Sequence, residues 1–424
     1  MLSIPVVAVA LAACAAQPVQ RPGAGAVVAA PSAAGPGAAP RPLLGPDGKL
    51  RAALLLPLSG PHAAVGEALL NGAQLALFEH GAERIELLPK DTAGDPARAA
   101  SAARAAIAEG AAIVLGPLFA QEAEAVAPVA GPAGVPVLAF TTDPAQARPG
   151  LWVLGFLPEP PVRRVVAAAR AAGAERFAAL VPENAYGRLV LDAYRRAVAE
   201  AGGVLVRQEI YPGSNPAPAV RRLANYEARR GPIDAQIRAA RALGTAEGRR
   251  RAAQLQREAR VPPPDFDALL LADGGEQLRA VAALLPFYDI DNPPVRILGT
   301  PLMAAMPDAG REPALVGAWY AAPDDQRRTA FEARYREAYG RVPPIVAGVA
   351  FDAAAIAVTL ATEPGGPDLS PPALTQPQGF AGALGILRLM PDGTNRRGLS
   401  LMEVRRDGAI VIEPAPDRFD ERVF

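Results

Sequence analysis

The sequence is poor in the residues that most often carry enzyme chemistry. Its 424 residues include a single cysteine, Cys14, and two histidines, His62 and His80. One thiol cannot form an intrachain disulfide, and so few cysteines and histidines offer no thiolate and imidazole set for a metal. The HExxH, GxSxG, SxxK and phosphate-loop patterns are also absent. We therefore predict that the protein is not an enzyme and that it holds no metal or cofactor.

Lysine is nearly absent as well, so arginine supplies most of the positive charge. Lys49 and Lys90 are the two lysines, yet lysine and arginine together number 43 and balance 43 acidic residues. Half of all residues are hydrophobic. A neutral chain with this apolar content is typical neither of a disordered segment nor of a nucleic-acid-binding protein, and its length fits two or three domains.

The apolar run at the N-terminus, from Leu2 to Ala16, is shorter than the roughly 20 residues that a bilayer core requires. It contains the sequence LAAC, which ends at Cys14 and resembles the lipobox of bacterial lipoproteins. That resemblance implies a signal peptide over residues 1–13 and a lipid on Cys14. The alternative is an apolar N-terminus with an unrelated cysteine.

The next segment, residues 14–48, is rich in proline, alanine and glycine and shows no periodicity, so we expect a tether. Ala15 follows the cysteine where lipoproteins kept at the inner membrane carry an aspartate, and this resembles lipoproteins sorted to the outer membrane. We therefore expect a periplasmic protein that a lipid anchors at the outer membrane.

From residue 50 onward, short apolar runs alternate with amphipathic stretches, which predicts α/β structure with parallel sheets. A first set of strands is expected at 50–56, 85–89, 112–115, 135–140 and 152–156. A second set is expected at 177–181, 204–211, 268–271, 295–298 and 314–320, followed by C-terminal strands at 382–389 and 399–412. Two successive sheets indicate two lobes and a cleft, with ligands outside the carboxyl ends of the strands.

Two further patterns leave alternatives open. Residues 221–260 hold eleven arginines against four carboxylates, which indicates either a solvated pair of helices or a docking surface for an acidic partner or wall polymer. The aromatic residues Phe287, Tyr288, Trp319 and Tyr320 either line the cleft or belong to the core.

Six segments resemble, in order, the type I periplasmic binding proteins, and most closely their leucine-binding branch. They are LLLPLSG, DTAGDPARAASAA, IVLGPLF, APVAGPAGVPVLAFTT, AYGRLVLDAYRRAVAEAGG and VAFDAAAIAV. The resemblance implies an α/β fold of two Rossmann-like lobes with parallel sheets around a central cleft. It places lobe 1 at 49–157 and 322–384, and lobe 2 at 158–321 and 385–415.

The same resemblance implies which residues line the ligand cleft. They are Ser59, Gly60, Leu118, Phe119, Ala120, Thr141, Thr142, Tyr186 and Asp273. Amino-acid binders of this family hold the ligand carboxylate with a serine three residues after Gly-Pro, where this chain has Ala120. They also bring a carboxylate to the ligand ammonium after the strand at 295–298, where this chain has Gly299-Thr300-Pro301. We therefore expect an incomplete amino-acid site, because a buried zwitterion needs partners for both charges.

A narrower resemblance covers residues 266–301, which are similar to the penicillin-binding protein activators, lipoproteins that contact a peptidoglycan synthase. It implies that the chain regulates peptidoglycan synthesis through that contact, without catalysis. The alternative is a substrate-binding lipoprotein of an ABC importer for amino acids or a related small amphiphile, with a permease as its partner. Neither interpretation involves nucleic acid.

Overall fold

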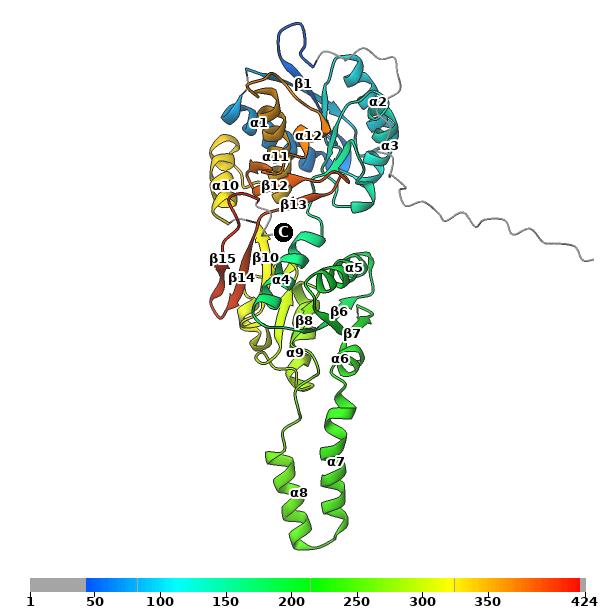
Figure 1. Cartoon of the computed structure of the whole chain (residues 1–424), viewed down its shortest axis with the longest axis vertical. Helices are drawn as coiled ribbons and strands as arrows, with labels where there is room; N and C mark the ends of the chain where they lie inside the picture. The colour runs from blue at the N-terminus through cyan, green and yellow to red at the C-terminus, as the bar shows by residue number, and fades with distance from the viewer. Residues whose placement is uncertain (1–42, 82, 214, 324, 420–424) are drawn as a thin grey trace, which may run out of the picture. The chain divides into compact units, whose positions relative to one another are not determined.

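The structure, a computed structural model, describes residues 43–81, 83–213, 215–323 and 325–419. The expected signal peptide, the lipidated Cys14 and most of the tether lie outside these described residues. The described residues from Leu43 onward form one compact unit, and this unit consists of two α/β lobes (Figure 1). The expected fold class, an α/β fold with parallel sheets in two lobes, is confirmed.

The first lobe is built on a parallel five-stranded sheet of order β2-β1-β3-β4-β5. Its strands are β1 (Leu50–Leu56), β2 (Ile85–Asp91), β3 (Ile113–Leu115), β4 (Val137–Ala139) and β5 (Leu151–Val153). Successive side chains of β1 enter cores on opposite faces, since Leu54 packs with one buried cluster and Leu55 with another. Both faces are therefore covered, which explains why β1 is a continuous apolar run.

Two pairs of helices cover this sheet, one pair on each face. One face carries α1 (Ala63–His80) and α11 (Ile345–Ala361), and the other carries α2 (Pro96–Ala108) and α3 (Ala120–Ala130). The first pair approaches closely at Gly72, where an added Cβ would lie 2.2 Å from the carbonyl oxygen of Ala347. This contact requires glycine, because nothing larger fits between the two backbones.

The second lobe contains a seven-stranded sheet of order β15-β14-β10-β9-β8-β6-β7. The strands are β6 (Arg176–Pro182), β7 (Val204–Tyr211), β8 (Ala268–Leu271), β9 (Arg296–Gly299), β10 (Trp319–Pro323), β14 (Leu399–Arg405) and β15 (Gly408–Glu413). Helices α4 (Glu159–Ala171) and α5 (Ala185–Glu200) cover one face, and α6 (Ala217–Leu223) and α9 (Gly275–Phe287) cover the other. At one edge of this sheet, β14 pairs antiparallel with β10, and β15 pairs antiparallel with β14.

The C-terminal region differs from the expected lobe boundary at residue 385. Strands β11 (Phe380–Gly382), β12 (Gly385–Leu389) and β13 (Asn395–Arg397) form a small antiparallel sheet. Leu387 and Leu389 are fully buried in the core of the first lobe, beside α10 (Asp325–Tyr339), α11 and α12 (Pro371–Leu374). A buried ion pair of 2.7 Å between Arg397 and Asp352 holds β13 to α11. Residues 385–397 therefore belong to the first lobe, and the second lobe resumes at Leu399.

Two expected strands are also different in the structure. The strand expected from residue 314 begins only at Trp319, because Pro313–Leu315 forms a 3₁₀ turn and Gly317 has a positive φ of 83°. The strand expected at 399–412 is the antiparallel pair β14 and β15, which a turn at Arg406 and Asp407 connects. In both cases a turn interrupts an otherwise apolar stretch.

The arginine-rich segment forms a helical hairpin, α7 (Tyr226–Ala242) and α8 (Ala246–Glu258), which extends from the second lobe (Figure 1). The two helices pack on each other through a cluster of their own. In the described ranges, no helix combines the length and the apolar character that crossing a membrane requires.

Candidate functional site

The residues expected in the cleft lie after the carboxyl ends of parallel strands. In the first lobe, Ser59 and Gly60 follow β1, residues 118–120 follow β3, and Thr141 and Thr142 follow β4. In the second lobe, Tyr186 lies in the first turn of α5 after β6, and Asp273 follows β8. Ligands of open parallel sheets bind at such edges. The role of these residues as ligand contacts stays a prediction.

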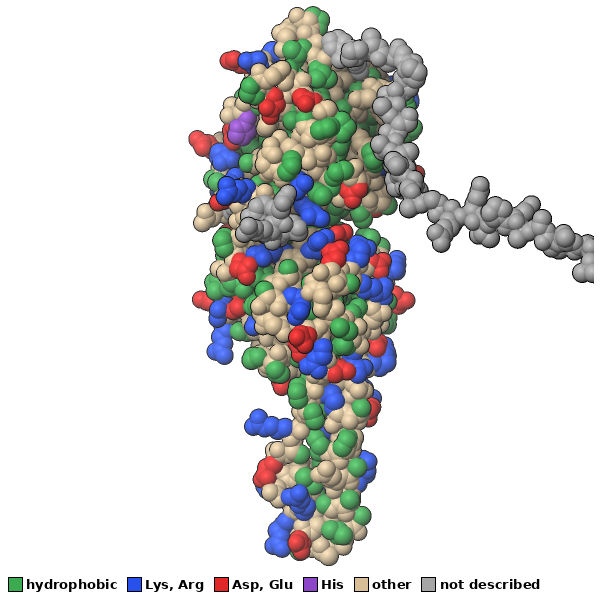
Figure 2. Space-filling view, in the orientation of Figure 1, with side chains coloured by type: hydrophobic (Ala, Val, Ile, Leu, Met, Phe, Trp, Pro, Cys, Tyr) green, Lys and Arg blue, Asp and Glu red, His purple; other side chains and the backbone are tan. Residues whose placement is uncertain are grey.

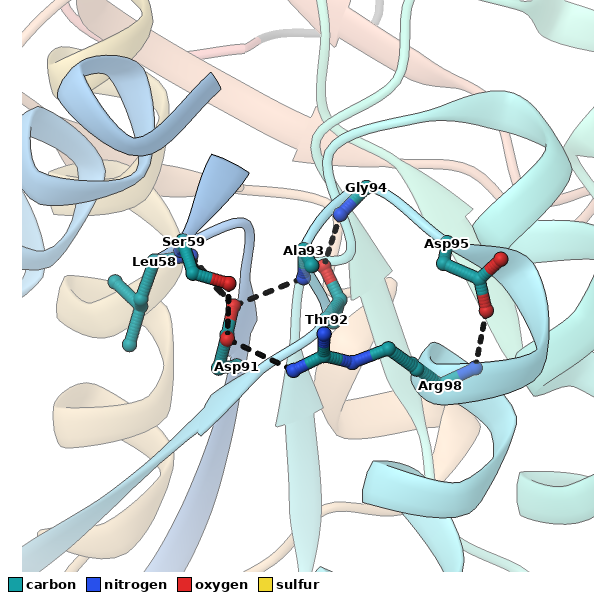
Figure 3. A network of polar contacts seen from close by, with 8 residues as sticks. All are labelled: Leu58, Ser59, Asp91, Thr92, Ala93, Gly94, Asp95 and Arg98. Carbon is teal, nitrogen blue, oxygen red and sulfur yellow. Dashed lines mark hydrogen bonds and ion pairs between the residues drawn. The ribbon is translucent and has the colours of Figure 1, made fainter. Parts of the chain in front are cut away.

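Asp91, at the end of β2, organises the loop that carries Ser59 (Figure 3). Its Oδ1 accepts hydrogen bonds from the backbone N–H groups of Leu58 (2.9 Å), Ser59 (3.1 Å) and Ala93 (2.8 Å). Its Oδ2 accepts from the Ser59 hydroxyl at 2.6 Å and from Arg98 Nη2 at 2.9 Å. The Ser59 hydrogen bond is the main reason that the pKa of Asp91 lies below its usual value. The Ser59 proton is thus already used within the protein.

Local hydrogen bonds also hold the turn after Asp91. Thr92 Oγ1 accepts from the backbone N–H of Gly94 at 3.3 Å, and the carboxylate of Asp95 caps α2 by accepting from the Arg98 N–H at 2.8 Å (Figure 3). Ala93 and Gly94 both have positive φ, 53° and 76°. No local pattern in the sequence indicates that Asp91 and Arg98 hold the Ser59 loop.

The N-terminus of α3 is occupied by a carboxylate of the chain itself. Glu122 is fully buried, and its Oε2 accepts from the backbone N–H of Phe119 at 3.1 Å. Burial raises the pKa of Glu122, although hydrogen bonds from Thr92 and Phe119 act in the opposite direction. A helix N-terminus favours an anion through its free N–H groups and its dipole. Glu122 accepts from the N-cap residue Phe119 and places an acidic side chain at the helix start, while Ala120 has no hydroxyl. This helix start is therefore less favourable for a ligand carboxylate than that of the amino-acid binders with a serine at this position.

Aromatic and hydroxyl groups complete the edge of the first lobe. The rings of His62 and Phe119 are 4.8 Å apart between centroids, and Gly94 lies against Phe119. The hydroxyl of the buried Thr141 accepts from the backbone N–H of Asp143 at 3.1 Å, whereas Thr142 is exposed. This edge therefore offers an apolar surface together with the Thr142 hydroxyl.

In the second lobe, the polar groups gather around Asp273. Its Oδ2 accepts a hydrogen bond from the Tyr211 hydroxyl, and its Oδ1 accepts from the Gly274 N–H at 2.9 Å. Burial, and then the hydrogen bond to Asp273, raise the pKa of Tyr211, so this phenol stays protonated and donates. Burial is also the main cause of the raised pKa of Tyr186, to which the negative charge of Asp273 adds. The carboxylate of this edge thus follows β8, whereas the family pattern expects one after β9.

A cavity of about 480 Å³ lies elsewhere, beside the segments that connect the lobes. The residues that line it include Leu157, Arg163, Leu189, Met390 and Arg396, and none of the residues expected in the cleft. Arg163 pairs with Glu200 at 2.8 Å. Burial, followed by repulsion from Arg163, lowers the pKa of Arg396. This cavity therefore belongs to the hinge region and not to the strand ends.

Comparisons with known proteins agree with this geometry. A family model described as periplasmic binding protein matches residues 49–409. A Leu/Ile/Val-binding protein from Rhizobium johnstonii is 33% identical over 173 residues, which span 38% of this chain and about half, 47%, of that protein.

Two solved structures show the same fold. A protein provisionally assigned to a branched-chain amino acid ABC transporter of Rhodospirillum rubrum has a TM-score of 0.66 and 22% identity, covering 86% of this chain and 100% of that one. A solute-binding protein of an ABC transporter from Rhodopseudomonas palustris, in complex with benzoate, has a TM-score of 0.52 and 18% identity, covering 88% and 98%. The family is one of extracytoplasmic binding proteins, and the matched range includes both lobes. The chain therefore belongs to the periplasmic binding protein family, in its type I, leucine-binding form.

Proposed function

We propose that the protein is the substrate-binding component of an ABC importer. Its family and the named relatives support this proposal, because each relative is a binding protein or belongs to such a transporter. Two lobes with polar strand ends are the architecture of a hinged ligand trap. Lipid anchoring through Cys14 at the outer membrane is part of the same proposal. Labelled palmitate on the wild type and on Cys14→Ala tests the acylation, and separation of inner and outer membranes tests the location.

The ligand in this proposal is a small amphiphile whose charged end is a cation. The observation that carries this assignment is the buried Glu122 at the third position of α3, whose Oε2 accepts from Phe119 N, because an acidic side chain at this helix start disfavours a ligand carboxylate. Asp91 is likewise saturated by groups of its own lobe. Asp273 supplies a carboxylate at the edge of the second lobe, and Phe119 with His62 supplies an apolar contact for the ligand body.

Three analogues of one side chain test the assignment by calorimetry. Leucine carries both charges, 4-methylpentanoate only the carboxylate, and 3-methylbutylamine only the ammonium group. We expect 3-methylbutylamine to bind and the other two to give no heat at micromolar concentration. Micromolar binding of leucine or of 4-methylpentanoate contradicts the assignment. Absence of heat with all three also contradicts it and favours the second candidate.

The second candidate is a contact regulator of a peptidoglycan synthase. It is favoured by Phe287, at the end of α9 within the segment similar to the penicillin-binding protein activators. Its side chain is 68% exposed and so belongs neither to the core nor to the ligand edge. Aromatic side chains in such positions are common contacts of protein partners.

A pull-down from solubilised envelopes separates the two candidates. Recovery of a permease and ATPase pair supports import. Recovery of a synthase supports regulation instead, provided that Phe287→Ala reduces this recovery. Phe78→Ala is the matched control, because Phe78 is 76% exposed on the first lobe.

A further inference from the structure

The α7–α8 hairpin is a separate arm with a fixed base. Its helices pack through Ile237, Ala240 and Ala252, and Gly248 lets them approach, since an added Cβ would lie 2.4 Å from the Ala240 carbonyl oxygen. This cluster is separate from the cores of the two lobes.

Arg229 fixes the base of the arm to the second lobe. Its guanidinium donates to four backbone carbonyl oxygens: Pro262 at 2.7 Å, Ala224 at 3.0 Å, Tyr288 at 3.2 Å and Asp289 at 2.7 Å. Burial lowers the pKa of Arg229, with the charge of Asp289 opposing this. A half-buried arginine that donates to four carbonyl groups holds two segments in one orientation. The arm is therefore directed by its base and does not depend on contacts along its length.

The charge of the arm is strongly positive. Residues 226–260 contain nine arginines and four carboxylates, whereas the whole chain is neutral. Near the base, Arg230 pairs with Asp234 at 3.0 Å. Toward the tip the situation changes, because five exposed arginines have no carboxylate within ion-pair distance among the described residues. These are Arg238, Arg241, Arg249, Arg250 and Arg251. Figure 2 shows Lys and Arg side chains distributed along the arm.

The tip itself is apolar. The turn between the helices contains Leu243, whose side chain is 66% exposed, next to Ala242 and Ala246. Arg241 lies two residues before this leucine at the end of α7, and Arg249 of α8 reaches the same turn, since its Nη1 donates to the Gly244 carbonyl oxygen at 3.1 Å. The tip thus presents an exposed leucine flanked by arginines of both helices, with Glu247 as the carboxylate of the first turn of α8. Such a pattern matches the interface of a bilayer, where the apolar group enters and the cations remain at the level of the phosphates.

The arrangement of the arginines favours a bilayer over an acidic protein. Arg249, Arg250 and Arg251 are consecutive on α8, so they point in directions about 100° apart around the helix. A groove on a protein contacts one face of a helix. A bilayer that the tip of the arm meets end-on is an extended anionic surface, and it attracts arginines on every side of the helix. We propose that the tip of the α7–α8 hairpin binds the surface of a bilayer that contains anionic phospholipid.

Vesicle flotation tests this proposal with the full chain carrying Cys14→Ser, so that no thiol can be acylated. The vesicles contain either equal parts of phosphatidylglycerol and phosphatidylcholine, or phosphatidylcholine alone. We expect binding to the first kind only, and weaker binding as salt increases. Replacing Arg249, Arg250 and Arg251 with glutamine should lower the partition coefficient on the order of a hundredfold, since each basic side chain contributes about fivefold at such a surface.

The matched control replaces Arg84, Arg104 and Arg336 with glutamine. These arginines are exposed on the first lobe and have no ion pair among the described contacts, so they resemble the arginines of the tip. Both triple variants lose three positive charges, so the net charge changes equally. We expect this control to lower partitioning by less than about threefold. Leu243→Ser should cause a loss of roughly tenfold by removing the apolar insertion. Helical circular dichroism of each variant shows whether the arm remains folded.

Three results overturn the proposal. The first is absence of binding to the phosphatidylglycerol vesicles, and the second is equal binding to phosphatidylcholine alone. The third is an arm variant that binds as tightly as its control while it loses an acidic protein in envelope pull-downs, which assigns the arm to a protein partner. None of these results bears on calorimetry of the cleft, so the arm and the importer proposal fail independently.

Discussion

The strand-end edges of the two lobes use their carboxylates differently. In the first lobe, Asp91 accepts five hydrogen bonds or ion pairs from its own lobe, and Glu122 is fully buried at the start of α3. In the second lobe, Asp273 has two such partners and is half-buried. The comparison shows that the first-lobe carboxylates serve mainly as internal hydrogen-bond acceptors, whereas Asp273 keeps fewer internal partners and is the carboxylate that our proposal assigns to the ligand.

The largest effect is expected for Asp91→Ala, which tests the structural role of the first-lobe carboxylate. The substitution leaves three backbone N–H groups and the Arg98 guanidinium without their acceptor. We expect the free energy of unfolding to fall by about 3 kcal/mol, because unsatisfied groups lose more than one ordinary hydrogen bond. Urea unfolding measures it. Asp95→Ala, which removes a single cap hydrogen bond, is the reference for a small loss. If Asp91→Ala costs no more than this reference, Asp91 is not a structural carboxylate, and the first lobe does not differ from the second in this respect.

A smaller effect is expected for Tyr211→Phe in the second lobe. The change removes the hydroxyl that donates to Asp273 and keeps the buried ring. The free energy of unfolding should fall by about 1 kcal/mol. If Asp273 is the ligand group, the affinity for 3-methylbutylamine should also change, because the carboxylate loses the partner that orients it. Unchanged affinity together with reduced stability would give Asp273 a structural role like that of Asp91.

The smallest effect concerns the pH dependence of Glu122→Gln. Burial raises the pKa of Glu122 above its usual value of 4.5, so the folded protein holds this proton more tightly than the unfolded chain does. The stability that this proton provides is complete below pH 4.5 and is lost as the pH rises through the pKa of the folded protein. The glutamine variant should lack this decrease, which we expect to be within about 1 kcal/mol. Identical profiles of the variant and the wild type above pH 4.5 contradict the buried, proton-holding carboxylate.

The sequence predicted the lobes well because their strands depend on local patterns. β1 is an unbroken apolar run, and its expected bounds at 50–56 agree with the structure. The ion pair of Arg397 with Asp352 could not be predicted, since its partners are 45 residues apart in sequence. Both side chains are buried where β13 packs against α11, and no local pattern indicates that contact. Without it, residues 385–397 have no local feature that assigns them to the first lobe.

The sequence predicted that the candidate residues follow strands, but it did not predict their hydrogen-bond partners. Ser59, Thr141 and Asp273 follow strands, and position after a strand is readable from periodicity. The role of Glu122 was missed because the residue before α3 is Phe119, whereas a capping box is recognised by serine or threonine there. Ala93 and Arg98 are local partners of Asp91, whereas Leu58 and Ser59 lie 33 and 32 residues away in sequence. Their convergence depends on the pairing of β1 with β2, which the sequence did not contain as a local signal.

The most direct test of the account is calorimetric titration of 3-methylbutylamine into the wild type and into Asp273→Asn. The asparagine keeps the size of the side chain and an acceptor for Tyr211, but it removes the charge. We expect the variant to unfold at nearly the same urea concentration and to bind the amine at least about tenfold more weakly, the loss of a charge-assisted hydrogen bond. Equal affinity of the two proteins would contradict the claim that the second lobe recognises the ligand's charge.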